Sequence, residues 1–238
     1  MGPKNFVVVG AARSGLGRTA RLLSGLGAEC GHERVFHPVG FRAGPTLHWS
    51  TECPGEASWF AAPVLGKLPE SIVVVRQVRD PLAVVSELYG SGFFERNDED
   101  RWFAEDFLGD EAGAPPLERA MLHWLRWNQL IEDTLQVTPL EGHRVFAESL
   151  TRPVDPSAVG ASRGAGVLAR ITRAIGVARH RSICAKALER LGAPEEPEFA
   201  PRRLDWDDLP AGRTLDEMRA LAAQYGYGVE SRRRRLTA

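Results

Sequence analysis

The feature that most constrains the fold is a buried-strand pattern followed directly by a glycine-containing segment, Phe6–Val9 and then Gly10–Gly17. Four consecutive apolar residues without alternation are typical of a strand covered on both faces, as in a parallel sheet. The residues that follow place apolar side chains at helical spacing, at Leu16, Ala20, Leu23 and Leu26. A glycine loop between a buried strand and a helix N-terminus offers backbone N–H groups to an anion. We therefore expect an anion-binding loop here.

The alternation of strand and helix patterns continues along the chain. Ile72–Val75 is a second buried run, and Asp80-Pro81 after it supplies an N-cap and a first helical residue. Residues 144–147 are predicted to form a third strand, and residues 28–30 a short, weak one. Such alternation predicts an α/β fold with a mainly parallel sheet flanked by helices. Ligands then bind beyond the carboxyl ends of the strands, at the loops 10–18 and 77–86.

The remaining segments are expected to surround this core. Residues 90–116 are rich in glycine, proline and acidic residues, which indicates a long lid or acceptor-binding loop. The helix predicted at 117–135 carries Trp124 and Trp127 on one face, which favours core packing. We expect residues 1–150 to form the nucleotide-binding α/β core and residues 151–238 a mostly helical C-terminal extension of the same domain.

Two further patterns belong to that extension. Thr214 and Glu217 have the spacing of a capping box and predict the start of the last helix. The four arginines at 232–235 are expected to be a solvated tail.

Charge and cysteine content exclude several classes of protein. The chain has 30 basic and 31 acidic residues, which argues against a generally basic nucleic-acid binder. No apolar run approaches the ~18–20 residues of a membrane span, and the first residues lead into a strand instead of a signal peptide. The three cysteines lie far apart, and His32 and His37 do not share a helix face. We expect a cytoplasmic protein without a metal site, with no nucleic acid or membrane partner.

Two kinds of nucleotide loop match this segment only partly. In an ATPase loop, Leu16 and Gly17 stand where the phosphate-binding lysine and the metal-binding hydroxyl belong, which argues against an ordinary nucleoside triphosphatase. The spacing of Gly10, Ala12 and Gly15 is also a variant of the dinucleotide fingerprint. That fingerprint calls for a strand ending in an acidic residue, for which only Glu33, after a weak strand, is available. A dinucleotide-binding oxidoreductase remains an alternative.

A third interpretation uses two separated arginines. Arg13 lies inside the loop, and Arg79 follows the next buried strand. Guanidinium groups suit phosphate and sulfate oxygens. This arrangement predicts a ligand with two anionic ends, such as a nucleotide with a 5′-phosphosulfate and a 3′-phosphate.

At these residues the sequence resembles the sulfotransferases that use 3′-phosphoadenosine 5′-phosphosulfate (PAPS). Arg13-Ser14-Gly15 is similar to the start of their 5′-phosphosulfate loop, Arg-Ser-Gly-Thr-Thr, and Arg79-Asp80-Pro81 with a downstream serine to their 3′-phosphate element. Cys30-Gly31-His32-Glu33 is similar to the Cys-Gly-Glu-Glu stretch of protein-tyrosine sulfotransferases. The resemblance covers about residues 5–150 and implies a P-loop-like three-layer fold.

The resemblance also implies roles for individual residues. Glu33 would be the catalytic base, with His32 as the second candidate, and Arg13 would stabilise the leaving phosphate. The residues implied in donor binding are Arg13, Ser14, Gly15, Leu16, Gly17, Arg18, Thr19, Arg79 and Ser86.

The sequence departs from the family pattern at two places. Leu16 and Gly17 replace the loop threonines, so that Arg18 or Thr19 would have to substitute. Glu87 stands where the family has its serine, and Ser86 lies one residue earlier.

The function expected from the sequence is transfer of a sulfuryl group from PAPS to a hydroxyl of a small-molecule or carbohydrate acceptor. Besides the dinucleotide-binding oxidoreductase, the departures leave a degenerate, non-catalytic nucleotide-binding protein as an alternative.

Overall fold

The computed structural model of the chain describes residues 4–36, 53–150, 160–191 and 203–230. The chain divides into two compact units. Unit 1 comprises Met1–Val78 and Leu130–Glu195, and unit 2 comprises Arg79–Gln129 and Glu196–Ala238. These boundaries differ from the single boundary expected near residue 150. The arginine tail 232–235 lies outside the described residues.

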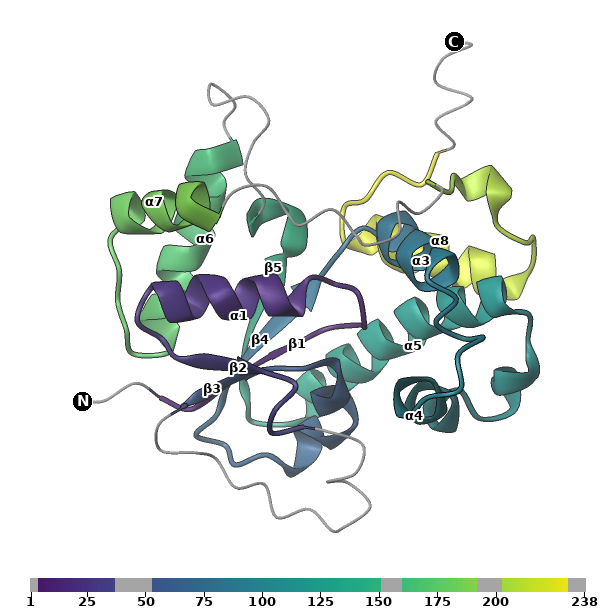
Figure 1. Cartoon of the computed structure of the whole chain (residues 1–238), viewed down its shortest axis with the longest axis horizontal. Helices are drawn as coiled ribbons and strands as arrows, with labels where there is room; N and C mark the ends of the chain where they lie inside the picture. The colour runs from purple at the N-terminus through teal and green to yellow at the C-terminus, as the bar shows by residue number, and fades with distance from the viewer. Residues whose placement is uncertain (1–3, 37–52, 151–159, 192–202, 231–238) are drawn as a thin grey trace. The chain divides into compact units, whose positions relative to one another are not determined.

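Unit 1 contains a five-stranded sheet in the order β2-β3-β1-β4-β5 (Figure 1). All four neighbouring pairs of strands are parallel. The central strand β1 is completely buried, as its apolar sequence predicts. The strands are β1 (Phe6–Val9), β2 (Cys30–His32), β3 (Gly55–Ala57), β4 (Val73–Val78) and β5 (Glu141–Phe146). The predicted α/β class with a parallel sheet is confirmed.

The position of β3 distinguishes this sheet from that of dinucleotide-binding folds. Those folds place the second strand of the chain directly beside the first, in the order 3-2-1-4-5. Here β3 lies between β2 and β1 and pairs with both. In the dinucleotide fold, the ribose-binding acidic residue follows the strand next to β1. Here Glu33 follows β2, which is separated from β1 by β3.

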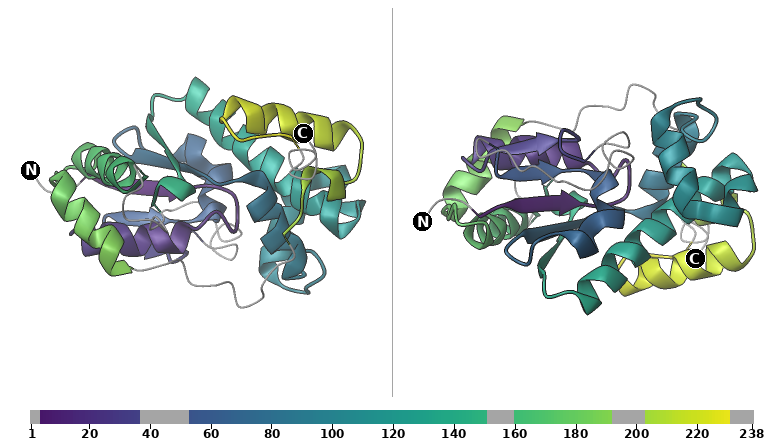
Figure 2. Two further views of the ribbon diagram at one scale, coloured as in Figure 1. Left: turned by 90° about the horizontal axis from the view of Figure 1, so that it is seen from above. Right: turned by 90° about the horizontal axis from the view of Figure 1, so that it is seen from below.

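Helices flank the sheet of unit 1 (Figure 2). Helix α1 (Leu16–Gly25) packs on β1, β2 and β3, and the 3₁₀ helix η1 (Trp59–Lys67) packs on β1. Helices α6 (Gly160–Ala174) and α7 (Arg181–Leu191) pack on each other, and α7 also contacts α1. A short 3₁₀ helix, η3 (Ala147–Leu150), follows β5 and contacts α6. The helix predicted after the glycine loop is present, and α6 and α7 lie in the segment after residue 150 that was expected to be mostly helical.

Unit 2 is helical around a core of large aromatic side chains. Trp124, Trp127 and Trp206 are buried, as expected for the first two. The elements are α3 (Pro81–Gly90), α4 (Glu99–Leu108), η2 (Gly109–Gly113), the part of α5 (Pro116–Val137) up to residue 129, η4 (Trp206–Asp208) and α8 (Arg213–Gln224).

The expectation of a long irregular loop at 90–116 is wrong, because this segment contains helix α4. Asp98 is the N-cap, and its carboxylate accepts a hydrogen bond from the amide of Arg101 at 3.0 Å. Glu99 and Asp100 follow in the first turn, where negative charge is favourable to the helix dipole. The acidic residues that suggested a loop instead begin a helix.

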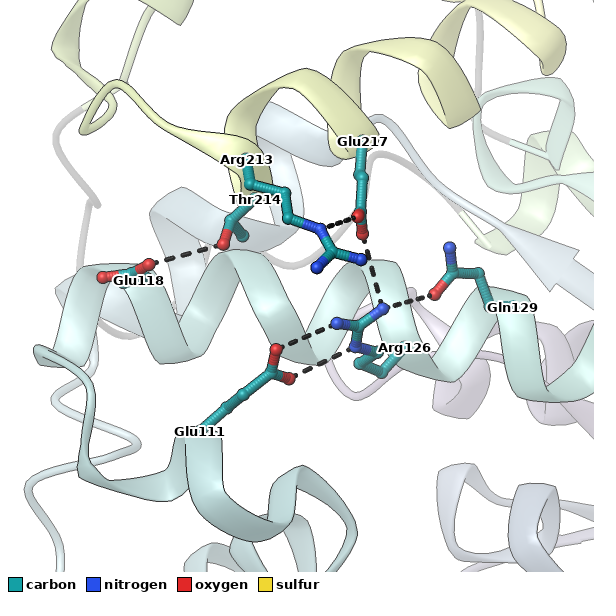
Figure 3. A network of polar contacts seen from close by, with 7 residues as sticks. All are labelled: Glu111, Glu118, Arg126, Gln129, Arg213, Thr214 and Glu217. Carbon is teal, nitrogen blue, oxygen red and sulfur yellow. Dashed lines mark hydrogen bonds and ion pairs between the residues drawn. The ribbon is translucent and has the colours of Figure 1, made fainter.

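The predicted capping box at the start of α8 is also wrong. The N-cap is Gly212, which makes no side-chain capping bond. The hydroxyl of Thr214 instead donates to Glu118 of α5 at 3.3 Å (Figure 3). Glu217 accepts hydrogen bonds from Arg213 at 2.6 Å and from Arg126 of α5 at 3.4 Å. Thr214 thus bonds to a residue of α5, and Glu217 bonds to Arg213 and Arg126, so that neither side chain caps the backbone at the start of α8.

Arg126 is the centre of this polar network. Its guanidinium donates to both carboxylate oxygens of Glu111, at 2.9 and 3.2 Å, and to Gln129 at 3.2 Å, in addition to Glu217 (Figure 3). The network therefore joins η2, α5 and α8 within unit 2.

Candidate functional site

The glycine loop of unit 1 has two residues in the left-handed backbone region. Arg13 has a φ of 63° and Gly15 a φ of 87°. The amide of Ser14 donates to the carbonyl of Ala11 at 3.1 Å, which closes a tight turn before α1. Gly15, the residue before α1, makes no side-chain capping bond. The first amides of a helix have no intrahelical acceptor, so this terminus presents N–H donors to a ligand.

Gly10 is required by the close approach of β4. A Cβ at this position would lie 2.4 Å from the carbonyl oxygen of Gln77 and 2.7 Å from Oγ of Ser14. No side chain fits at such distances without a shift of the backbone. The first glycine of the motif therefore serves packing of the loop against the sheet.

Gln77, which the sequence analysis did not single out, holds the loop in place. It is 1% exposed at the carboxyl end of β4. Its Nε2 donates to the carbonyl of Ser14 at 2.6 Å, and its Oε1 accepts the hydroxyl hydrogen of Thr19 at 2.6 Å. One amide side chain thus ties the loop and the second turn of α1 to the sheet. Its position directly before Val78-Arg79 is the only sequence signal for it.

Ser14 places a buried hydroxyl inside the loop. The residue is 1% exposed, and its Oγ has no hydrogen-bond partner in the described part of the chain. An unsatisfied buried polar atom costs roughly 1–3 kcal/mol, so its presence requires an explanation, and a bound ligand is one. A hydroxyl at a helix N-terminus fits an oxyanion ligand.

The two side chains expected to replace the missing loop threonines have partners within unit 1. The hydroxyl hydrogen of Thr19 is used in its bond to Gln77. The guanidinium of Arg18 donates to the carbonyl of Leu150, at 3.3 and 3.4 Å. Arg13 is exposed and Leu16 is buried. Donor contacts by these residues remain predictions.

His32 lies against the first turn of α1. A Cβ at residue 17 would lie 3.3 Å from Cε1 of the imidazole, which is a tight contact. Glycine at this position therefore leaves room for the ring. Burial, and then the positive charge of Arg21, lower the pKa of His32 from its ordinary value. The imidazole is therefore neutral near pH 7. Its Nε2 lies 3.5 Å from Oε1 of Glu33.

Glu33 occupies a strained backbone position beside the loop. Its φ of 54° is in the left-handed region, which a non-glycine residue adopts only when its surroundings hold it there. Its amide donates to the carbonyl of Ala57 at the end of β3, at 3.1 Å. Its side chain is 30% exposed and is accessible to a substrate.

Glu56 of β3 holds the turn that carries Glu33. Its carboxylate is buried, and Oε1 accepts hydrogen bonds from the amides of Arg34 at 2.5 Å and Val35 at 3.0 Å. Burial raises the pKa of Glu56, while these two bonds oppose the shift. The other oxygen, Oε2, would lie 2.2 Å from a Cβ at Gly31, which explains the glycine there. The sequence analysis did not single out this residue.

In unit 2, Arg79 forms an ion pair with Glu87. Their Nη2 and Oε1 atoms are 2.6 Å apart, and the side chains are 27% and 18% exposed. The predicted helix start is confirmed, since Asp80 accepts from the amide of Ala83 at 3.0 Å and Pro81 is in the first turn. The indole of Trp124 donates to the carbonyl of Arg79 at 3.1 Å.

Ser86, predicted to contact a 3′-phosphate, is 5% exposed. Its Oγ accepts a hydrogen bond from the amide of Leu204 at 3.1 Å. This hydroxyl thus helps to hold the segment before η4 within unit 2. A contact to phosphate stays a prediction.

The structure brings together part of the predicted site. Within unit 1, the glycine loop, His32 and Glu33 are neighbours through the contact of His32 with Gly17. Arg79 and Ser86 belong to unit 2, and a ligand shared by Arg13 and Arg79 stays a prediction. His37 lies outside the described residues.

The described residues contain neither a metal-binding cluster nor a helix that could span a membrane. No three His, Cys, Asp or Glu side chains there gather in a way that could hold a metal ion. No helix in the same residues is both long and apolar enough to cross a bilayer.

Comparison with known proteins supports the fold. The sequence matches no family model and no curated protein. A solved structure described as the sulfotransferase domain from the curacin biosynthetic pathway superposes with a TM-score of 0.53 and 14% sequence identity. The match covers 96% of this chain and 99% of that chain. The chain thus shares the α/β fold of that domain, which confirms the predicted fold class.

Proposed function

We propose that the chain is a PAPS-dependent sulfotransferase that acts on a hydroxyl of a small-molecule or carbohydrate acceptor. The observation that carries this proposal is the glycine loop, where a helix N-terminus and the buried, unpartnered Ser14 hydroxyl meet on the fold of a sulfotransferase domain. The dinucleotide alternative loses support because its strand order differs from the one observed.

The loop would hold the 5′-phosphosulfate. Amides at the start of α1 and the hydroxyl of Ser14 would donate to its oxygens, while the exposed Arg13 would approach the phosphate. During transfer, negative charge grows on the phosphate as the sulfur–oxygen bond to it breaks. Donors already fixed at that position stabilise the transition state more than the ground state. Gln77 contributes by fixing the loop.

Glu33 and His32 would act on the acceptor. The hydroxyl oxygen attacks sulfur, its proton passes to the carboxylate of Glu33, and 3′-phosphoadenosine 5′-phosphate leaves. His32 is neutral and can donate from Nε2 to the Glu33 carboxylate, 3.5 Å away. His32 would then position the carboxylate of Glu33, as one hydrogen-bonded side chain orients another in many catalytic sites. Arg79 would hold the 3′-phosphate of the donor.

Binding experiments test the donor assignment. We expect calorimetry to show binding of 3′-phosphoadenosine 5′-phosphate, with ATP and NADH binding more weakly. Ser14→Ala removes the buried hydroxyl and should weaken binding by about tenfold, the effect of one hydrogen bond to a charged group. Ser71→Ala, at an exposed serine, is the matched control. Preference for NADH would contradict the proposal.

Transfer assays over a panel of hydroxyl acceptors test the base. Glu33→Gln should lower kcat by ~10²–10⁴-fold and leave donor binding unchanged. His32→Asn should lower kcat less and shift the pH dependence of kcat. Full activity of Glu33→Gln would remove Glu33 from the mechanism.

A further inference from the structure

The backbone of Glu33, the base in the proposed function, needs support from outside its own turn. Its φ of 54° is in the left-handed region, which is disfavoured for a residue with a side chain. Such a conformation persists where the surrounding structure holds it. Because the backbone sets the direction of the Cα–Cβ bond, the contacts that hold this turn also direct the carboxylate.

Strand β3 supplies these contacts along consecutive residues. The carbonyl of Ala57 accepts a hydrogen bond from the amide of Glu33 at 3.1 Å. Oε1 of Glu56 accepts hydrogen bonds from the amides of the next two residues, Arg34 at 2.5 Å and Val35 at 3.0 Å. Three successive amides of the turn are thus bound by two neighbouring residues of the sheet.

Ser58 extends this set of contacts to the end of the turn. Its hydroxyl donates to the carbonyl of Phe36 at 3.4 Å, and its amide donates to the carbonyl of Val8 in β1 at 2.9 Å. Both Ser58 and Phe36 are completely buried. Side chains two residues apart on an extended chain lie on the same side, so Glu56 and Ser58 reach the same turn. Residues 33–36 are therefore held at every residue.

Glu56 is the contact in this set that depends most on the identity of a side chain. A backbone carbonyl at 57 is present whatever the residue, whereas a side chain without an acceptor at 56 would leave two amides without their bond. The carboxylate is completely buried, and a Cβ at Gly31 would overlap its Oε2. Burial of a carboxylate is costly, so its two bonds to one turn require an explanation.

We infer that Glu56 is a positioning residue for sulfuryl transfer, which directs the carboxylate of Glu33 by binding the two amides that follow it. This inference rests on the proposed function, because Glu56 acts only through the base. All of the contacts lie within unit 1. Misplacement of a reacting group by about 1 Å can lower a rate by ~10²-fold, so loss of these two bonds should be measurable in kcat.

The test compares kcat in transfer assays with the Kd of 3′-phosphoadenosine 5′-phosphate in calorimetry. Glu56→Leu removes the acceptor and keeps a side chain of similar size, so kcat should fall by about 10–100-fold. The Kd should stay within about twofold, because Gln77 holds the glycine loop independently of Glu56. Glu56→Gln retains an acceptor for both amides and should keep kcat within about threefold of wild type. Glu70→Leu, at an exposed residue of the same unit, should change neither quantity.

Gly31→Ala tests the same contact if Glu56→Leu does not fold. The new Cβ would overlap Oε2 of Glu56, so the carboxylate must shift away from the two amides although its charge is retained. We expect kcat to fall by about tenfold or more while the Kd is unchanged. Gly25→Ala, at a position where a Cβ has room, is the matched control and should leave kcat unchanged.

A double-mutant cycle with Glu33→Gln separates positioning of the base from a general loss of structure. If Glu56 acts through the Glu33 carboxylate, Glu33→Gln/Glu56→Leu should have the kcat of Glu33→Gln, within about twofold. A general loss of structure would instead lower kcat to the same extent with and without that carboxylate.

The outcomes separate this inference from the proposed function. Equal losses of kcat from Glu56→Leu in wild type and in Glu33→Gln would overturn the inference and leave the proposed function standing. Full activity of Glu56→Leu would do the same, as would an equal loss in Glu56→Gln and Glu56→Leu. If wild-type protein sulfates no acceptor of the panel, the proposed function fails and the inference with it.

Discussion

The glycine loop of unit 1 and the Arg79 element of unit 2 follow a buried strand in the same way but are stabilised differently. The loop is fixed by uncharged, buried contacts: the Gln77 amide, the hydroxyl of Thr19 and the close approach at Gly10. The Arg79 element is fixed by a charged pair between residues of the same segment.

The difference concerns what each region offers to a ligand. Uncharged contacts leave the donors of the loop, among them the Ser14 hydroxyl, for an incoming anion. In the second region Arg79 is already paired with Glu87, so that an anion at this guanidinium would have to compete with a carboxylate. In general, donors that are fixed without being used favour the binding of an anion, whereas an internal partner opposes it.

The largest effect is expected from Gly10→Ala, which disrupts the close packing of the loop against β4. The new Cβ would lie 2.4 Å from the Gln77 carbonyl, so the loop must separate from β4. We expect a loss of about 3 kcal/mol in the free energy of unfolding, together with loss of nucleotide binding. Urea denaturation and calorimetry measure the two.

Gly25→Ala is the matched control for this variant. Apart from its chain neighbours and the backbone of its own helix, no atom of the described residues lies within 4 Å of a Cβ at Gly25, the last residue of α1. Alanine is a better helix former there and should be neutral or stabilise by up to ~1 kcal/mol. Equal effects of the two substitutions would show that the close contact at Gly10 does not matter.

A smaller effect is expected from Glu56→Gln, which sharpens the comparison by replacing a buried carboxyl group of unit 1 with an uncharged amide. Burial raises the pKa of Glu56 in the folded protein above its ordinary value of 4.5. The unfolded chain loses this proton at lower pH than the folded one. The stabilising contribution is thus complete below pH 4.5 and is lost as pH rises through the raised pKa.

Urea denaturation across this pH range tests the expectation. The free energy of unfolding of wild type should fall with rising pH relative to that of Glu56→Gln, whose amide still accepts both backbone bonds. Glu70→Gln, at an exposed residue, should follow the wild-type curve. Parallel curves for wild type and Glu56→Gln would be incompatible with a raised pKa.

The smallest effect is expected from the network around Arg126 in unit 2. Arg126→Met removes contacts to Glu111, Glu217 and Gln129 (Figure 3). The groups are partly solvated, so we expect a loss of ~0.5–1 kcal/mol in the free energy of unfolding, less at high salt. Arg213→Met, at a side chain that is 88% exposed, should cost less. A loss that does not depend on salt would indicate packing by the arginine stem instead.

Local sequence patterns correctly predicted the elements that depend only on neighbouring residues. The apolar run Phe6–Val9 forms the buried central strand, and Asp80 with Pro81 begins α3. Trp124 and Trp127 are in a core. Patterns that depend on a distant partner failed, as at Thr214, whose hydroxyl bonds Glu118 instead of its own helix. Acidic residues at 98–100 were misleading because they suit a loop and a helix terminus equally well.

By itself, the sequence determined a parallel α/β fold with a glycine-containing turn between β1 and α1, because neighbouring residues largely set burial and backbone conformation. Only the tertiary structure decided that the short, weakly patterned β3 lies between β2 and β1. That strand order places Glu56 beside Gly31 and above the turn of Glu33. Likewise, only the fold showed that Gln77 holds the loop and that Glu87 pairs with Arg79. A hydrogen bond or ion pair depends on which side chains the fold brings within 3–4 Å, and spacing along the chain does not record that distance.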